Sequence, residues 1–544
     1  MTTEPTPPAP RPEGRRAKVG RRLLAGTVIA LLPIMLGLSR DFGVTWDELP
    51  RQRFGERIFR YYAGEFGVER FGTDGSRFYG GLFDATAVAL QRLLPFDDYD
   101  IRHALNAFYG WLGVAACAAL ATRLAGPWAG LLAALFAASA PRYFGHSMNN
   151  PKDIPFAALG AWVLYALSWI RPAYPYLDWR AAAAIGFAIG LSLSVRPGGV
   201  LFLAYAAAVV LMAIVANRER DPRRLAATAA AFVLLAFIAT TVPLPFWPWL
   251  QTRPYVGLLE AVGGVSEVGW DGAMLFKGRE ITASTVPGDY IPVWLVYTTP
   301  PVVLAGALLS LGWLRRGVRG GFPVIALWFA VLFPMVYVVV RQSRIYDEIR
   351  HLLFAIPPLF VLASLGWWWL LGAARGAYRT GVLTVLVLGV LEPIAFQARN
   401  HPNQVVYFNA LLGGPKGALQ RFELDYWGNC LYEAMQHAAE LARGVDMQIR
   451  ISGERSALMA LNASRIPDVR VTSASRGLHH LEVIHLRGPK AKIVSETHRT
   501  DILYRVTMAD GTPLCTVVPG PRYEELDAQL RGARNVLPSG ATAR

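Results

Sequence analysis

Residues 23–38 read LLAGTVIALLPIMLGL, and the chain then reaches Thr45-Trp46-Asp47-Glu48. Basic residues at 15, 16, 18, 21 and 22 precede the apolar run. Many further apolar runs follow, and the small-residue cleavage site of a signal peptide does not, so we expect an uncleaved first span. The two stretches together predict a membrane protein with adjacent carboxylates, Asp47 and Glu48, at the membrane surface.

The composition excludes an ordinary soluble protein. Of the 544 residues, 53% are hydrophobic and only 17% are charged, and the mean hydropathy is +0.31. The net charge of +15 could suggest a nucleic-acid partner. However, the arginines form short clusters between apolar runs, which is typical of residues that orient a membrane protein. We therefore expect a polytopic α-helical membrane protein and no nucleic acid.

Eleven spans are expected, because a helix needs about 20 apolar residues to cross a bilayer. They are residues 22–39, 102–122, 127–142, 156–171, 181–196, 199–216, 225–242, 291–313, 321–340, 352–372 and 378–398. The fifth and sixth are separated by Arg196-Pro197-Gly198-Gly199. This segment is either a tight turn at the surface or a break inside one bent hairpin.

Basic residues between the spans predict the orientation. If residues 1–21 are a disordered, basic cytoplasmic tail, most loops on that side are rich in arginine, as the positive-inside rule requires. These arginines are Arg123, Arg171, Arg180, Arg218, Arg220, Arg223, Arg224, Arg315, Arg316, Arg319, Arg375 and Arg379. The outer side then receives residues 40–101, 143–155, 243–290, 341–351 and everything after residue 399. Frequent Ala, Arg and Gly suggest a GC-rich bacterium, so we expect a multi-pass inner-membrane protein with a periplasmic active face.

Two outer regions have predicted structure of their own. The first outer loop, 40–101, should contain amphipathic helices at Glu48–Tyr62 and Leu82–Leu94 that lie on the membrane. Residues 399–544 should form a small extracytoplasmic α/β domain, with a helix at 430–443 and strands at 447–451, 469–472, 481–486, 503–507 and 514–518. Cys430 and Cys515 could pair there. The aromatics of loop 243–290 either belong to the interfacial belt or form a lid.

The outer loops hold a set of candidate site residues. Asp47 and Glu48 could simply complement a helix dipole, but other ionisable groups share their side of the membrane. Ionisable groups at a membrane boundary tend to mark pathways or sites. The further ionisable residues on this side are Lys152, Asp153, Arg196, Arg344, Arg350 and His351. A cavity lined by carboxylates and several cations would suit an anionic, lipid-borne substrate.

This arrangement resembles the C-type (GT-C) membrane glycosyltransferases over about residues 22–398. The features are the acidic pair after the first span, the amphipathic first outer loop, and two strings, which are Asn149-Asn150-Pro151-Lys152-Asp153-Ile154-Pro155-Phe156 and Arg350-His351-Leu352-Leu353 before Pro357-Pro358. The chain looks most similar to the branch with protein O-mannosyltransferases and the aminoarabinose transferases of lipid A. The resemblance implies transfer of a sugar from a polyprenyl-phosphate carrier at the outer membrane face.

The resemblance also assigns roles to the candidate residues. It implies that Asp47 is the catalytic carboxylate and Asp153 a second acidic site residue. Because the chemistry requires only one carboxylate, we expect Glu48 to support the site by orienting an arginine or the acceptor. It implies that Arg350 and His351 bind the donor phosphate, together with Arg344, Lys152 and Arg196. Chemically, Asp47 could act as the general base of one inverting displacement, and cations could stabilise the leaving phosphate without a general acid.

Several alternatives remain open. Asp47 and Asp153 could hold a divalent cation with phosphate oxygens, but the branch resembled generally needs none, so we expect no essential metal or other cofactor. A lipid-linked glycan flippase would also be polytopic, although the charges here gather at one face and repeated halves are not evident. A glycan ligase or polymerase would share the same donor class. The sugar and the acceptor, whether protein, lipid or glycan, are not specified by the sequence.

Overall fold

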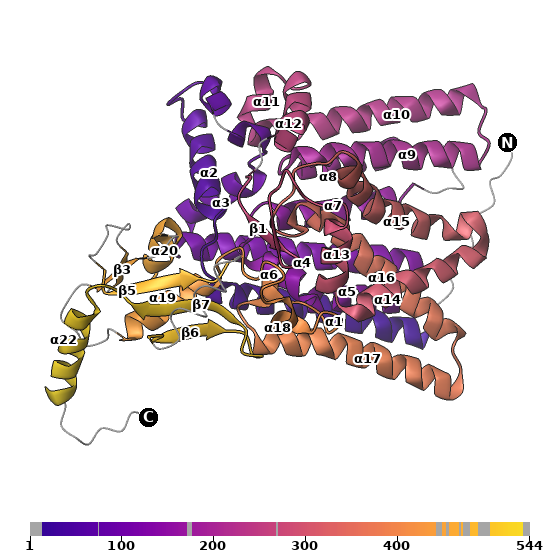
Figure 1. Ribbon diagram of the computed structural model, residues 1–544. Helices are drawn as coiled ribbons and strands as arrows, with labels where there is room; N and C mark the ends of the chain where they lie inside the picture. The colour runs from indigo at the N-terminus through magenta and orange to yellow at the C-terminus, as the bar shows by residue number, and fades with distance from the viewer. Residues whose placement is uncertain are drawn as a thin grey trace.

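The structure is a computed structural model that describes residues 14–73, 75–170, 177–267, 270–441, 449–452, 456–466, 469–471, 479–487 and 501–536. Long helices run side by side as a bundle, and the C-terminal sheet with its helices lies beyond one end of it (Figure 1). The first helix, Arg15–Leu38, begins at the opposite end. The chain is a polytopic helical membrane protein with a small C-terminal α/β region, as the sequence predicts.

Each of the expected spans coincides with a helix or a pair of helices. They are α1 (Arg15–Leu38), α4 (Asp98–Ala125), α5 (Pro127–Ser139), α7 (Asp153–Leu167), α8 (Trp179–Leu193), α9 (Val200–Ala216), α10 (Pro222–Thr241), α13 (Tyr290–Thr298) with α14 (Pro301–Leu309), α15 (Gly317–Val340), α16 (Ile356–Ala373) and α17 (Gly376–Arg399). Among the described residues, seven helices are long and apolar enough to cross a membrane, or eight if the bent pair is one span. Because α5, α7 and α8 are shorter, the count of eleven stays a prediction.

Three boundaries differ from the expectation. Helix α1 begins at Arg15, so the end of the segment expected to be disordered is helical; Trp128 stabilises it by donating its indole N–H to the Arg16 carbonyl (3.1 Å). The span expected at 291–313 bends by 109° between α13 and α14, where Pro300 and Pro301 cannot continue a helix. The span expected at 127–142 ends at Ser139 before a second proline-initiated helix, α6 (Pro141–Asn149).

The two helices predicted for the first outer loop are confirmed as α2 (Glu48–Tyr62) and α3 (Leu82–Leu93). Short 3₁₀ turns at Val68–Thr73 and Gly75–Phe78 lie between them. Helix α2 buries Phe54 and Ile58 in a cluster with Phe71, which accounts for its amphipathic pattern. Both helices stand at the end of the bundle that bears the C-terminal sheet (Figure 1).

Loop 243–290 folds into η5 (Leu244–Phe246), α11 (Pro248–Thr252), α12 (Val256–Glu267) and the hairpin of β1 (Met274–Phe276) and β2 (Arg279–Ile281). Trp247 is fully buried in a cluster with Phe78 and Leu250, and its indole N–H donates to the Arg77 carbonyl (2.7 Å). This part of the aromatic segment therefore packs against the first outer loop.

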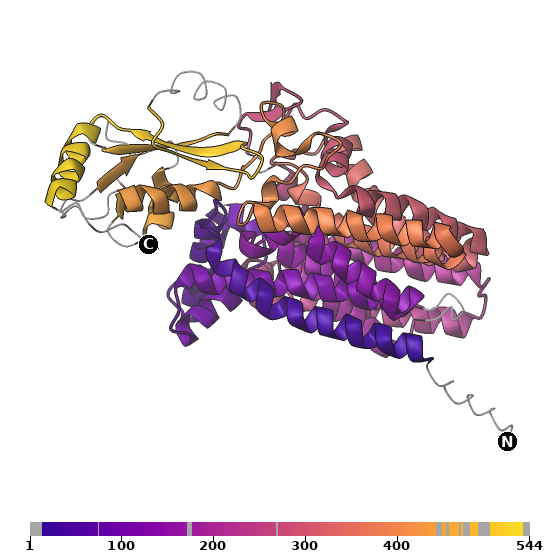
Figure 2. The same ribbon diagram turned by 90° about the horizontal axis from the view of Figure 1, so that it is seen from below.

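The helix and strands predicted after residue 430 are present, with shifts of one residue at several described ends, whereas residues 442–443, 447–448 and 472 of the predicted elements lie outside the described residues. They are α19 (Cys430–Leu441), β3 (Ile449–Ser452), β4 (Val469–Val471), β5 (Leu481–His485), β6 (Tyr504–Thr507) and β7 (Pro513–Pro519), with α18 (Gly414–Ala418), α20 (Ser456–Ala463) and α22 (Tyr523–Val536) in addition. The sheet order is β4-β3-β5-β7-β6. Figure 2 shows helices packed beside this sheet. Cys430 and Cys515 form a disulfide.

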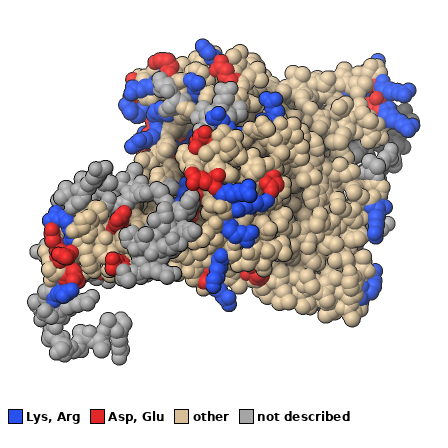
Figure 3. Space-filling view, in the orientation of Figure 1, with Lys and Arg blue, Asp and Glu red and all other residues tan. Residues whose placement is uncertain are grey.

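Charge is unevenly distributed between the ends of the bundle. Figure 3 shows mainly Lys and Arg at the end nearest the N-terminus and both signs at the end nearest the C-terminal region, with a broad uncharged surface between them. The connections α9–α10 and α16–α17 lie at the first end (Figure 1). Two of the arginine-rich loops predicted to share one side, those with Arg218 and Arg375, thus lie at the same end of the bundle. Arg171 lies outside the described residues.

Candidate functional site

Asp47 lies immediately before α2 and turns its carboxylate toward two cations. Its Oδ2 contacts Lys152 Nζ at 2.9 Å and Arg350 Nη1 at 3.0 Å. The three residues come from three helix starts, because Lys152 precedes α7 and Arg350 begins the 3₁₀ turn η7 (Arg350–Ala355). The Asp47 side chain keeps 20% of its surface exposed, so the shared carboxylate remains accessible.

Asp153 belongs to the same cluster of charges around Arg350, and Arg196 and Asn150 also contact its carboxylate. It forms an ion pair with Arg196, its Oδ2 accepts from Asn150 Nδ2 (2.9 Å), and the same oxygen lies 3.9 Å from Arg350 Nη1. Its backbone N–H donates to Asn150 Oδ1 (3.0 Å). As the first residue of α7, its negative charge also complements the helix dipole. Arg350 thus lies between the two predicted acidic site residues.

An aromatic wall surrounds the Arg350 guanidinium. Its carbon lies 4.9 Å from the ring centre of Tyr346, 5.0 Å from that of Trp427 and 5.9 Å from that of Tyr426. Trp427 is itself fixed by donating its indole N–H to His146 Nδ1 (3.1 Å). Such rings stabilise a desolvated cation while leaving its N–H groups available for anions.

All five residues predicted to bind the donor phosphate line one pocket of about 170 Å³. Lys152, Arg196, Arg344, Arg350 and His351 contribute to its wall, together with Tyr79, Tyr346 and Phe156 among others. The structure therefore brings together residues that are up to 199 positions apart in the range 152–351. A pocket with several cations and an apolar rim fits a phosphate attached to a lipid.

The cations control the protonation of Asp47. Burial alone would raise the pKa of its carboxyl group, but the charges of Lys152 and Arg350 outweigh burial and hold this pKa well below its ordinary value. Asp47 is consequently ionised throughout the neutral range. In this arrangement it is also a weak base, since its negative charge is already shared by two cations.

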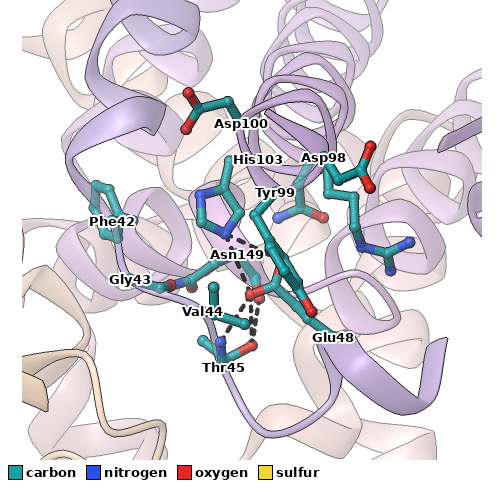
Figure 4. A network of polar contacts seen from close by, with 12 residues as sticks. Phe42, Gly43, Val44, Thr45, Glu48, Asp98, Tyr99, Asp100, His103 and Asn149 are labelled. Atoms are coloured by element: carbon teal, nitrogen blue, oxygen red, sulfur yellow. Dashed lines mark hydrogen bonds and ion pairs between the residues drawn. The ribbon is translucent and has the colours of Figure 1, made fainter. Parts of the chain in front are cut away.

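Glu48 lies apart from this group, although it is the next residue. Its Oε2 accepts from the Thr45 backbone N–H (2.8 Å) and the Thr45 hydroxyl (3.2 Å), and its Oε1 lies 3.1 Å from His103 Nε2. Figure 4 shows the carboxylate directed toward Thr45 and His103. Glu48 is the first residue of α2, and its buried carboxylate joins Thr45 before the helix to His103 of α4. The structure therefore places Glu48 in a contact between these segments, away from the predicted catalytic group.

The turn before Arg350 adds two residues that have no predicted role. Asp347 and Glu348 both adopt left-handed backbone angles, with φ of 54° and 68°. Glu348 forms a buried ion pair with Arg142, and its backbone N–H donates to the Tyr290 hydroxyl (3.0 Å). Arg142 stands at the end of the third span expected at 127–142 and at the start of a polar outer loop. The structure places it in α6, beyond the end of α5 at Ser139.

A metal-like group also occurs among the described residues. One ligand atom each of Asp425, Cys430 and His485 lie within 4.8 Å of one another. However, the Cys430 sulfur is bound to Cys515, and Asp425 accepts from the backbone N–H groups of residues 428, 429 and 430. These contacts explain the cluster as the start of α19 with its disulfide.

Comparison with known proteins finds solved structures only. No model of a protein family matches the chain, and no curated protein does. Among solved structures, ArnT from Cupriavidus metallidurans bound to undecaprenyl phosphate is 14% identical, with a TM-score of 0.49, over 93% of this chain and 98% of ArnT. Arabinofuranosyltransferase AftD from mycobacteria is 13% identical, with a TM-score of 0.43, over 92% of this chain and 41% of AftD. The Saccharomyces cerevisiae protein O-mannosyltransferase Pmt1–Pmt2 complex bound to the sugar donor is 16% identical, with a TM-score of 0.35, over 44% and 34%.

The solved structures to which the chain is similar are glycosyltransferases of the GT-C kind that the sequence resembles. With identities of 16% or less and TM-scores below 0.5, these similarities carry no argument about substrates or residue roles. The case for an activity rests on the residues of this chain.

Proposed function

We propose that this protein is a glycosyltransferase that moves a sugar from a polyprenyl-phosphate donor to an acceptor hydroxyl at the outer membrane face. The observation that carries the proposal is the Asp47 carboxylate shared by Lys152 and Arg350 beside a pocket that Arg196, Arg344 and His351 complete. A base and a phosphate-binding set are thereby adjacent, as a single inverting displacement requires.

Binding of the donor would activate the base. A donor phosphate attracts Lys152 and Arg350, the same cations that neutralise Asp47 in the free protein. Once they turn to the phosphate, the pKa of Asp47 rises toward its ordinary value and the carboxylate can accept the acceptor's proton. The cations then stabilise the phosphate as the sugar leaves it, which supplies the electrostatic part of catalysis. Asp153 keeps Arg196 in place through this exchange.

The proposal includes an orientation. The arginine-rich end of the bundle faces the cytoplasm, and the end with Asp47, α2, α3 and the C-terminal sheet faces the periplasm of a bacterial inner membrane. The distribution of charge in Figure 3 supports this, because positive charge gathers on the cytoplasmic side of membrane proteins.

The test uses purified full-length protein and radiolabelled polyprenyl-phosphate sugars of several kinds. A glycosyltransferase releases free polyprenyl phosphate and transfers label to an acceptor, whereas a flippase releases none. Asp47→Asn should abolish the release. Asp41→Asn is the matched control, since Asp41 lies on the same connection but contacts His401 (2.7 Å) at an exposed position. Full turnover by a well-folded Asp47→Asn protein would refute the assignment of the base.

A further inference from the structure

One arginine of the C-terminal region reaches the site that binds the phosphate. Arg487 lies two residues beyond the end of β5, and the intervening Leu486 donates its backbone N–H to the Leu514 carbonyl (2.9 Å). Its guanidinium forms ion pairs with Asp347 and, at 3.1 Å, with Glu423 Oε2. The side chain is only 11% exposed, and its guanidinium lies 5.0 Å from the Trp270 ring centre. Arg487 is therefore held by three partners, Asp347, Glu423 and Trp270, from distant parts of the chain.

Asp347 connects this arginine to the candidate active site. While its Oδ1 pairs with Arg487, its Oδ2 lies 3.6 Å from Arg350 Nη2, and Arg350 in turn contacts Asp47 at 3.0 Å. Charges of alternating sign thus run from the C-terminal region to the predicted base. Asp347 stands on the turn with left-handed backbone angles, a conformation that only the surrounding contacts maintain.

The balance of charge explains what Arg487 adds. Arg350 faces three carboxylates, those of Asp47, Asp153 and Asp347. Without Arg487, the Asp347 charge would be uncompensated beside Arg350. It would then draw the guanidinium away from Asp47 and repel an incoming phosphate. With Arg487 present, Asp347 orients Arg350 at little electrostatic cost to anion binding.

We propose that Arg487 is a positioning residue that makes the C-terminal region part of the phosphate site, acting through Asp347 on Arg350. This inference rests on the proposed function, because it takes a polyprenyl phosphate as the ligand. It assigns a role to a region that the sequence places outside the catalytic bundle.

The experiment measures binding of undecaprenyl phosphate to the full-length protein in detergent, with and without substitutions. Arg487→Met keeps the length of the side chain and removes its charge, and should weaken binding about 10-fold. Glu423 would take up a proton, since burial already raises its pKa, so the residual charge is that of Asp347. Asp347→Asn in the Arg487→Met background should therefore restore affinity to within about 3-fold of the unsubstituted protein.

Arg465→Met is the matched control. Arg465 also docks the C-terminal region, through Asp100 (2.6 Å) and the Phe42 carbonyl (2.8 Å), and is equally buried, but its contacts lie away from Arg350. It should leave the affinity unchanged. Equal weakening by Arg465→Met, unchanged affinity in Arg487→Met, or failure of Asp347→Asn to restore binding would each overturn the inference. Absence of binding to the unsubstituted protein would instead refute the proposed function and remove the basis of the inference.

Discussion

Two groups of buried charges contain the neighbouring residues Asp47 and Glu48, and they differ in whether a pocket gives access to the charged side chains. The open group consists of Asp47, Lys152, Asp153, Arg196 and Arg350, and it faces a pocket of about 170 Å³. The closed group lies around the start of α2 and α4, where protein partners surround each charge. The difference teaches that burial of charge alone does not indicate a ligand site. Cations that outnumber the carboxylates beside an accessible pocket are the better indication.

The closed group shows what structural ion pairs look like in this protein. Asp84 forms ion pairs with Arg51 and with Arg102, the latter at 3.5 Å, and is fully buried. Arg51 also donates to the Gly80 carbonyl (2.8 Å), and Arg102 to Gln52 Oε1 (3.1 Å). Together with Glu48 and His103, these contacts join α2, α3 and α4. They stabilise the first outer loop as a unit.

The largest predicted effect is on turnover, and it should distinguish Asp47 from its neighbour Glu48. Asp47→Asn should lower turnover by about 10²- to 10⁴-fold, because a general base typically contributes that much. The protein should still fold, since the amide oxygen can accept from Lys152 and Arg350, although loss of the two ion pairs should lower its unfolding temperature. The measurement is single-turnover transfer, with thermal unfolding as the check on folding. A loss of turnover that merely follows a loss of folded protein would place Asp47 in the closed group instead.

The second prediction concerns Arg350, the cation that contacts both Asp47 and Asp347. Arg350→Lys keeps the charge but loses the planar fork that reaches Asp47 and Asp347 at once, so affinity for undecaprenyl phosphate should fall about 10- to 100-fold. Arg51→Lys is the control from the closed group, and it should leave affinity unchanged while lowering the unfolding temperature. If both substitutions affected affinity equally, the distinction between the groups would fail.

Much of the open group is predictable because it gathers at helix ends. Apolar runs locate the ends of the spans, and polar residues that follow them on the outer side must share one layer of the membrane protein. Lys152, Arg196 and Arg350 were identified in this way. The same reasoning predicts α2 and α3, whose amphipathic pattern needs no tertiary information.

The remainder depends on tertiary contacts that local patterns do not contain. Glu48 follows Asp47 directly, yet successive helical residues point about 100° apart, and its partner His103 lies 55 positions away. Arg487 is 140 positions from Asp347, and only the docking of the C-terminal region brings them together. The sequence therefore predicts one acidic feature at Asp47 and Glu48, whereas the fold separates the two carboxylates.

The third prediction tests the closed group through Glu48. Glu48→Gln keeps an oxygen that can accept from the Thr45 N–H but removes the carboxylate that contacts His103. Because the pair is buried, the protein should lose about 1–3 kcal/mol of stability, seen as a lower apparent unfolding temperature. Turnover per folded molecule should stay within about twofold of the unsubstituted protein. If Glu48→Gln lost turnover while its stability stayed unchanged, Glu48 would have to be assigned a role in catalysis.

The smallest predicted effect is a shift in pH dependence. Lys152 and Arg350 lower the pKa of Asp47 against the opposing effect of burial. The stability that the ionised carboxylate contributes is therefore fully present above the ordinary pKa of about 3.9. It is lost only as the pH falls through the lower pKa of the folded protein. Lys152→Met removes one cation and leaves burial in place. The acid limb of kcat/KM, which reports the free enzyme, should then move up by about one pH unit.

Lys277→Met provides the comparison for this shift. Lys277 forms an exposed ion pair with Asp289 in the outer loop, away from the pocket, and salt and water screen such pairs. Its substitution should leave the acid limb where the unsubstituted protein has it. Coincident acid limbs in all three proteins would mean that Asp47 does not titrate with the activity, and that the cations beside it serve only to hold the fold.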